Sequence, residues 1–202
     1  MNFQKANFQN VVTWLGRIGR LDLTVFDDVR DDETATLPAL VVVVAASFLA
    51  GLGSWLWWVF QDIPDKGEVF LRSFILGSIL QVGVWLLWVY VTYSLLARTF
   101  GAVGSAQQLV RTMGFAFAPM AVSFLVLISV LSIPFGVISI GATLLLSNIA
   151  IQRTTSARPE QVALANFAGF AVFAIIMGIL ANLEEVRGLG GLAPGIFFFV
   201  LD

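Results

Sequence analysis

The sequence predicts an all-α membrane protein, a polytopic bundle of five transmembrane helices preceded by an amphipathic interfacial helix. Residues 112–152 contain no Asp, Glu, Lys or Arg, and a helix of that length would measure about 60 Å, roughly twice the hydrocarbon thickness of a bilayer. Hydrophobic residues make up 58% of the chain and charged residues 12%, far from the balance of soluble domains. Pro134-Phe135-Gly136 lies near the middle of the long run and predicts a turn between two spans.

Three further segments without charged residues are each long enough for one membrane helix: 34–61, 73–97 and 161–183. With the long run counted twice, the expected transmembrane domain covers 37–183, with a head at 1–36 and a short tail at 184–202. The expected spans are about 37–60, 73–97, 114–133, 135–152 and 162–183. The charge-free part of the tail, 188–201, has 14 residues, too few for a span, and is broken by Gly190, Gly191, Pro194 and Gly195, which predicts an interfacial or partly embedded segment.

The basic residues are unevenly shared between the two sides of this five-span arrangement. Eight of the 11 fall on the side of the N-terminus: Lys5, Arg17, Arg20, Arg30, Arg98, Arg111, Arg153 and Arg158. Cytoplasmic loops carry the excess of Lys and Arg in membrane proteins. We therefore expect a cytoplasmic N-terminus and a non-cytoplasmic C-terminal tail.

The head divides into two predicted helices. Its first part has apolar residues at near-helical spacing, with Arg17 and Arg20 on the polar side, which is typical of a helix in the headgroup plane. Those apolar residues are Phe8, Val11, Val12, Leu15 and Ile18. Thr24 is the predicted N-cap of the second helix. The acidic run 31–33 that follows is either a solvated linker, the interpretation we favour, or a docking site.

The segment between the second and third expected spans carries the best-formed motif. Gly101 and Gly104 predict a break in the helix, and Ser105 with Gln108 has the spacing of a capping box. Gly114 and Pro119 then mark the start of the third span, where proline is tolerated. We expect Gly101, Gly104, Ser105, Gly114 and Pro119 to form a structural loop motif.

These residues resemble a known family. Residues 96–105 and 111–119 are similar to the central signature of the Yip-one (Ypt-interacting protein) domain family, which pairs a Gly-Gly-x-Gly-Ser/Thr type loop with an Arg-x-x-Gly-Tyr-x-x-x-Pro segment. Phe115 stands where the family often has Tyr, and the Asp-Leu-Tyr-Gly-Pro-like motif of eukaryotic trafficking members is absent. The resemblance implies a prokaryotic-type integral membrane adaptor or organiser, with a role in membrane organisation or a trafficking-like process.

The composition argues against catalysis. The chain has no His and no Cys, so the commonest metal ligand and the usual general base are missing, and a serine nucleophile would have no histidine to activate it. The expected spans contain no Asp, Glu, Lys or Arg, the groups that mark ion-coupled pathways at membrane depth. We therefore expect no enzyme activity, no cofactor and no metal site. The net charge of −2 predicts no nucleic-acid partner.

Two embedded polar residues, Gln81 and Asn148, allow two interpretations. They form either an intramembrane polar site, which would indicate a small transporter or channel subunit, or interhelical hydrogen bonds worth about 0.6 kcal/mol each. We favour packing. The expected surroundings are the lipid bilayer and a membrane-protein or cytoplasmic partner. Small residues at four-residue spacing fit close helix packing within the chain as well as a homo-oligomer.

Overall fold

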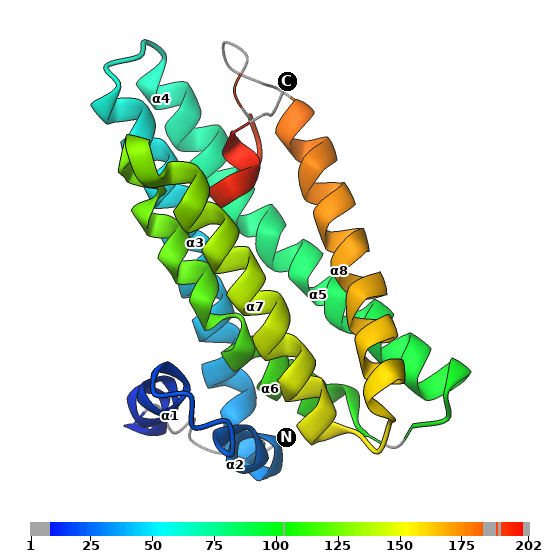
Figure 1. The fold of residues 1–202 in the computed structure, drawn as a ribbon. Helices are drawn as coiled ribbons and strands as arrows, with labels where there is room; N and C mark the ends of the chain where they lie inside the picture. Colours follow the sequence, from blue (N-terminus) through cyan, green and yellow to red (C-terminus); the bar gives the residue numbers. More distant parts are fainter. Residues whose placement is uncertain (1–8, 103, 184–188, 190, 200–202) are drawn as a thin grey trace.

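The structure is a computed structural model that describes residues 9–102, 104–183, 189 and 191–199. Its regular elements in these ranges are helices, and five of them are long and apolar enough to cross a membrane. They pack side by side in a bundle (Figure 1), which confirms the predicted fold class. The five cover Glu33–Phe60, Lys66–Thr99, Ala106–Leu127, Ser129–Thr154 and Pro159–Asn182.

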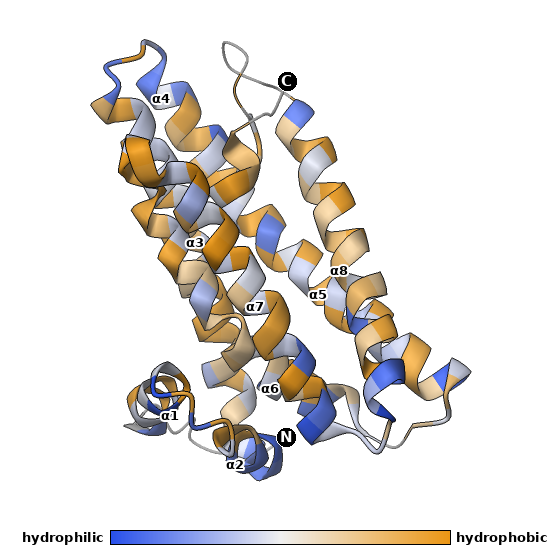
Figure 2. Cartoon of the chain, in the orientation of Figure 1, coloured by the Kyte–Doolittle hydropathy of each residue, from blue (hydrophilic) through white to orange (hydrophobic). Residues whose placement is uncertain are grey.

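Two short helices, α1 (Gln9–Gly19) and α2 (Val25–Asp31), lie across one end of the bundle. We call this the head end. A 3₁₀ turn, η1 (Glu33–Ala35), connects them to α3 (Thr36–Phe60). Hydrophobic residues dominate along the bundle, whereas hydrophilic residues gather on α1, α2 and the bundle ends (Figure 2), the distribution expected when lipid surrounds the middle.

The second span is longer than the charge-free segment 73–97 predicted. It comprises α4 (Lys66–Val69), the π-helical η2 (Phe70–Gly77), α5 (Ser78–Ser94) and the π-helical η3 (Leu95–Thr99). Arg72 and Glu68 form an i,i+4 ion pair at 2.7 Å. Because such a pair stabilises a helix, the charged residues continue the span instead of ending it.

The third span begins at Ala106 instead of near 114, because the capping box starts the helix there. Helix α6 (Ala106–Ala116) leads into a 3₁₀ segment, η4 (Ala118–Leu127). Ser105 Oγ accepts from the Gln108 N–H, and Gln108 Oε1 accepts from the Ser105 N–H, both at 3.1 Å. Pro119 lies at the start of η4, where its missing N–H has no partner to lose.

The turn between the third and fourth spans is at Ile128, not at Pro134–Gly136 as the sequence predicted. After the short η5 (Ser129–Leu131), α7 runs over Ser132–Thr154. Pro134 thus lies in the first turn of α7, where proline fits a helix without breaking it. Ser132 Oγ closes the turn by donating to the Val126 carbonyl at 2.6 Å.

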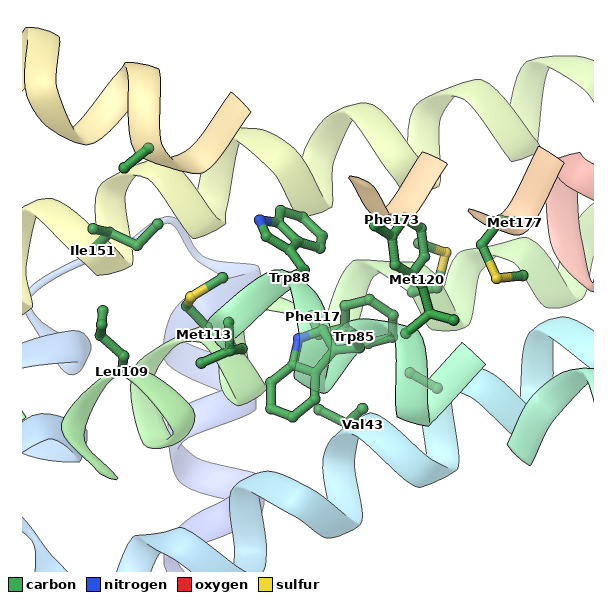
Figure 3. Packing of buried hydrophobic residues seen from close by; sticks show 14 of the residues in the cluster. Val43, Trp85, Trp88, Leu109, Met113, Phe117, Met120, Ile151, Phe173 and Met177 are labelled. Carbon is green, nitrogen blue, oxygen red and sulfur yellow. The ribbon is translucent and has the colours of Figure 1, made fainter. Parts of the chain in front are cut away.

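The last span, α8 (Pro159–Asn182), packs along α5 around buried aromatic rings. Trp85 and Trp88 of α5 meet Phe117 of the third span and Phe173 of α8 (Figure 3). Trp88 Nε1 donates to Asn166 Oδ1 at 3.1 Å. Trp85 is fully buried and fills space between these helices.

The described part of the tail packs into the opposite end of the bundle. Its short helix η6 (Gly195–Phe198), red in Figure 1, begins at Gly195, which is buried at φ +68°. The Gly195 N–H donates to Ser54 Oγ at 2.9 Å, and Ser73 Oγ donates to the Ala193 carbonyl at 3.4 Å. A left-handed residue in close contact with the first span requires glycine here.

Candidate functional site at the head end

Helix α1 ends in a Schellman motif and is tied to α2 by Arg17. The Leu21 N–H donates to the Ile18 carbonyl and the Asp22 N–H to the Arg17 carbonyl, both at 2.9 Å. Arg17 then pairs with Asp22 at 2.7 Å and with Asp28 at 2.5 Å. The corner between the two helices is therefore closed by both backbone and side-chain bonds.

Thr24, the predicted N-cap of α2, makes no side-chain cap. Its hydroxyl donates to Asp22 Oδ1 at 2.6 Å and accepts from Arg17 Nη2 at 3.0 Å. The Thr24 hydroxyl, followed by the Arg17 guanidinium, holds the pKa of the Asp22 carboxyl below its ordinary value. The carboxylates of Asp28 and then Asp22 raise the pKa of Arg17. Thr24 thus serves the α1–α2 corner instead of the α2 backbone.

Helix α2 is fastened to α7 by two arginines. Arg30 Nη1 donates to the Arg153 carbonyl at 2.7 Å, and Arg153 Nη1 pairs with Asp27 at 2.9 Å. On the other face, Val25, Phe26 and Val29 are fully buried. The head is therefore held against the end of α7 by apolar burial and by reciprocal polar bonds.

Arg111 connects α2 to the first and third spans and is only 7% exposed. Its Nε donates to Thr36 Oγ1 at 2.8 Å, and its Nη1 donates to the Arg30 carbonyl at 3.1 Å. That carbonyl lies in the last turn of α2, where the helix dipole favours a cation. A buried charge needs such partners, so Arg111 fixes where α2 can lie. The sequence marked Arg111 only as a basic loop residue.

The residues of the predicted loop motif lie at separate places in the fold, and two of its glycines make close contacts with other helices. Gly101 has φ +62° and open space around it, and a Cβ on Gly104 would lie 3.1 Å from Thr155 Cγ2 at the end of α7. A Cβ on Gly114 would lie 2.8 Å from Ala39 Cβ on α3. Pro119 is further along the third span. The motif residues hold the head-end loop, α3 and α7 together instead of forming one pocket.

A comparison with protein families decides what this arrangement belongs to. The family model described as the Yip1 domain matches residues 23–182. The chain belongs to the Yip1 domain family. The match covers α2, all five spans and the motif between the second and third of them. Comparison with curated proteins and with solved structures gives no match.

The two candidate polar residues of this Yip1 domain occupy different positions. Gln81 is 1% exposed and lies near the middle of the second span, whereas Asn148 lies close to the head end of α7. Neither Gln81 Oε1 nor Asn148 Oδ1 has a hydrogen-bond partner among the described residues. Neither oxygen therefore accepts an interhelical hydrogen bond, whereas Asn166 Oδ1 accepts one from Trp88 Nε1.

Among the residues that the structure describes, no group of three or more acidic side chains could hold a metal ion. What the head end offers is a fixed arrangement of arginine and aspartate side chains at the edge of an apolar bundle. Such an arrangement suits the docking of a protein or of a membrane surface.

Proposed function

We propose that this Yip1 family member is a non-catalytic integral membrane adaptor or organiser of prokaryotic type. Its docking surface would be the head end, which we expect to face the cytoplasm. The observation that carries the proposal is the attachment of α2 by Arg30, Arg111 and Arg153 to the first, third and fourth spans. An attached head presents its outer side chains in one arrangement, which lowers the entropy cost of binding.

The charged side chains available for docking lie on several elements. Arg158 and Glu160, at the start of α8, have side chains 71% and 69% exposed. In the acidic run, Asp31 pairs with Arg30 and Asp32 accepts from the Thr34 N–H, so both carboxylates have local partners. The run therefore serves the local structure, and the surface around the last two spans is the better candidate for a partner.

Photo-cross-linking in native membranes tests the adaptor proposal. A photoreactive residue replaces Glu160 at the head end or, as a matched control, Asp62 at the opposite end, whose side chain is 92% exposed. We expect a protein adduct of discrete mass from position 160 and none from position 62. Adding Arg153→Gln, which removes the pair with Asp27, should reduce the adduct. Equal labelling at both ends would contradict a docking surface at the head end.

The alternative is a small transporter or channel subunit, favoured by the buried, unpaired oxygens of Gln81 and Asn148. A flux measurement in liposomes separates the two functions. For an adaptor, purified protein should give no flux above empty liposomes, and Gln81→Leu and Asn148→Leu should change stability by about 1 kcal/mol or less. Flux that either substitution abolishes, with the fold intact, would replace the adaptor by the transporter.

A further inference from the structure

A groove of about 620 Å³ separates the head from the third and fourth spans. Its walls are almost entirely apolar and come from α1 and the residues after it, from the start of η4 and from α7. They include Leu15, Ile18, Leu21, Pro119, Leu145 and Ile149. The volume falls within the range of sites that hold a small molecule.

The groove opens onto the surface of α7 that faces lipid. Leu145 is 68% exposed and Ile138, two turns earlier, is 57% exposed. Helix α1 lies at the head end (Figure 1), and the surrounding bundle is apolar (Figure 2). Because the chain is an integral membrane protein, acyl chains are the solvent at this surface, and the groove is continuous with them.

Leu21, at the mouth of the groove, has a strained backbone conformation. It occupies the C′ position of the α1 Schellman motif at φ +59°, where glycine is usual and a Cβ is strained. Its side chain lines the groove and is 74% exposed. An apolar side chain at a position that favours glycine is explained if it contacts an apolar ligand.

A cation stands next to this apolar mouth. Arg20 lies between Gly19 and Leu21, both of which line the groove, and it is exposed. Within the described residues it has no ion pair, whereas Arg17, one turn earlier, pairs with Asp22 and Asp28. No acidic residue lines the groove. Asp22, which lies between the lining residues Leu21 and Leu23, is paired with Arg17 at 2.7 Å. The unpaired charge next to the mouth is therefore that of Arg20, which is complementary to an anion.

We propose that the groove binds one phospholipid, with an acyl chain along α7 and η4 and the phosphate at Arg20. The apolar walls match the chain, and the unpaired guanidinium matches the phosphate. This site does not depend on the adaptor function, since a lipid can occupy the groove whatever protein docks at the head end.

The test uses a phosphatidylglycerol probe with a photoreactive group in its acyl chain, added to vesicles of phosphatidylcholine that contain the purified protein. Adducts are mapped by peptide mass spectrometry, and we expect them on α1 and α7 around the groove. Ala142→Phe fills the groove and should reduce these adducts to background. Gly141→Phe is the matched control, because a side chain at Gly141 meets open space, and should leave them unchanged.

Two surface variants keep the test decisive if Ala142→Phe fails to fold. Arg20→Gln should reduce adduct formation about fivefold, while Arg98→Gln, an exposed arginine elsewhere at the head end, should not. A diacylglycerol probe, which lacks the phosphate, should be insensitive to Arg20→Gln. Leu21→Gly should weaken labelling without lowering the melting temperature, because it removes the backbone strain.

Two outcomes would overturn the proposal. Labelling that is equal in the protein, Arg20→Gln and Leu21→Gly would mean that the probe samples the whole lipid-facing surface. Cross-links between two copies of the chain at the groove, removed by Ala142→Phe, would mean that a second copy occupies it instead of a lipid.

Discussion

Gly114 and Ala39 set the distance at which α6 packs against α3. A Cβ at position 114 would lie 2.8 Å from Ala39 Cβ and 3.1 Å from the Ala39 carbonyl oxygen, so the two backbones can approach only because residue 114 has no side chain. Arg111, one turn earlier on α6, donates a hydrogen bond to Thr36, which lies on α3 like Ala39. A small residue and a cation on one face of α6 therefore align it with the first span.

We expect Gly114→Val to destabilise the protein by about 1–3 kcal/mol through overpacking, measured as a lower melting temperature in detergent. Gly104→Val should cost less, since its neighbour is the movable Thr155 methyl at 3.1 Å. Gly141→Val is the control: it lies in α7 with open space around it and should change stability by about 0.5 kcal/mol or less. Equal tolerance at positions 114 and 141 would mean that α6 and α3 can separate without cost. Gly190, one of the residues that break the tail sequence, lies outside the described residues.

How well single residues could be predicted depended on how far away their partners lie. The Ser105 capping box was predictable because both partners are three residues apart. The role of Arg111 was not, since its acceptors come from 75 and 81 residues earlier in the chain. For Gln81 and Asn148 the sequence indicates a position inside the membrane domain but identifies no hydrogen-bond partner, and their roles stay predictions.

At the scale of elements, α1 and α2 form one unit that packs on the bundle. Trp14 is 6% exposed and meets Phe115 edge-to-face at 5.2 Å, while Val12 is 77% exposed. The helical spacing of apolar residues predicted the helix, but it placed the exposed Val12 on the apolar side. Packing against Phe115 of the third span determines the rotation of α1, and no pattern within α1 encodes that contact.

The α1–α2 corner should loosen in acid. The folded-state pKa of Asp22 is lowered by the Thr24 hydroxyl and by Arg17, so its contribution to stability is complete above the ordinary aspartate pKa of about 4 and is lost as the pH falls through the lowered value. A spin label on Val12→Cys, the single cysteine of that chain, should become more mobile over this acid range. Asp22→Asn should give a mobile label already at neutral pH, with a weaker pH response. If the label on Val12→Cys is equally mobile with and without Asp22→Asn, Asp22 does not hold the corner.

The boundaries of elements were harder to predict than their existence. Charge-free length indicated a helical hairpin in residues 112–152, but it could not distinguish a proline that makes a turn from one in the first turn of a helix. The turn at Ile128 depends on Ser132, whose hydroxyl reaches the Val126 and Ile128 carbonyls. Likewise, the capping box overrides the hydropathy pattern at the start of the third span.

At the scale of the molecule, five spans place the head-end loops and the tail on opposite sides of the membrane. The number of spans was predictable because bilayer thickness and backbone hydrogen bonding allow few alternatives. The packing of the tail was not, because Gly195 meets Ser54 and Ser123 only in the folded bundle. The orientation stays a prediction from the distribution of basic residues.

Cysteine labelling tests this orientation without a fusion, because the chain has no Cys. We expect an impermeant maleimide to label Asp62→Cys in intact cells, and Gln107→Cys at the head end only after permeabilisation. Both positions are exposed, so access to the reagent is comparable. The reverse pattern would place the head end outside, against the positive-inside rule.

The bond between Gly195 and Ser54 also has a consequence for the order of synthesis. The two residues are 141 positions apart, so a ribosome making about 5–20 residues per second releases the first span many seconds before its partner exists. During that interval the Ser54 hydroxyl can bond to the Ala50 carbonyl of its own helix, as it does at 3.2 Å in the finished fold. The first span to be made is thus among the last to complete its contacts. A nascent chain that stops before the tail would have all its spans in the membrane and an empty space at the position of Gly195.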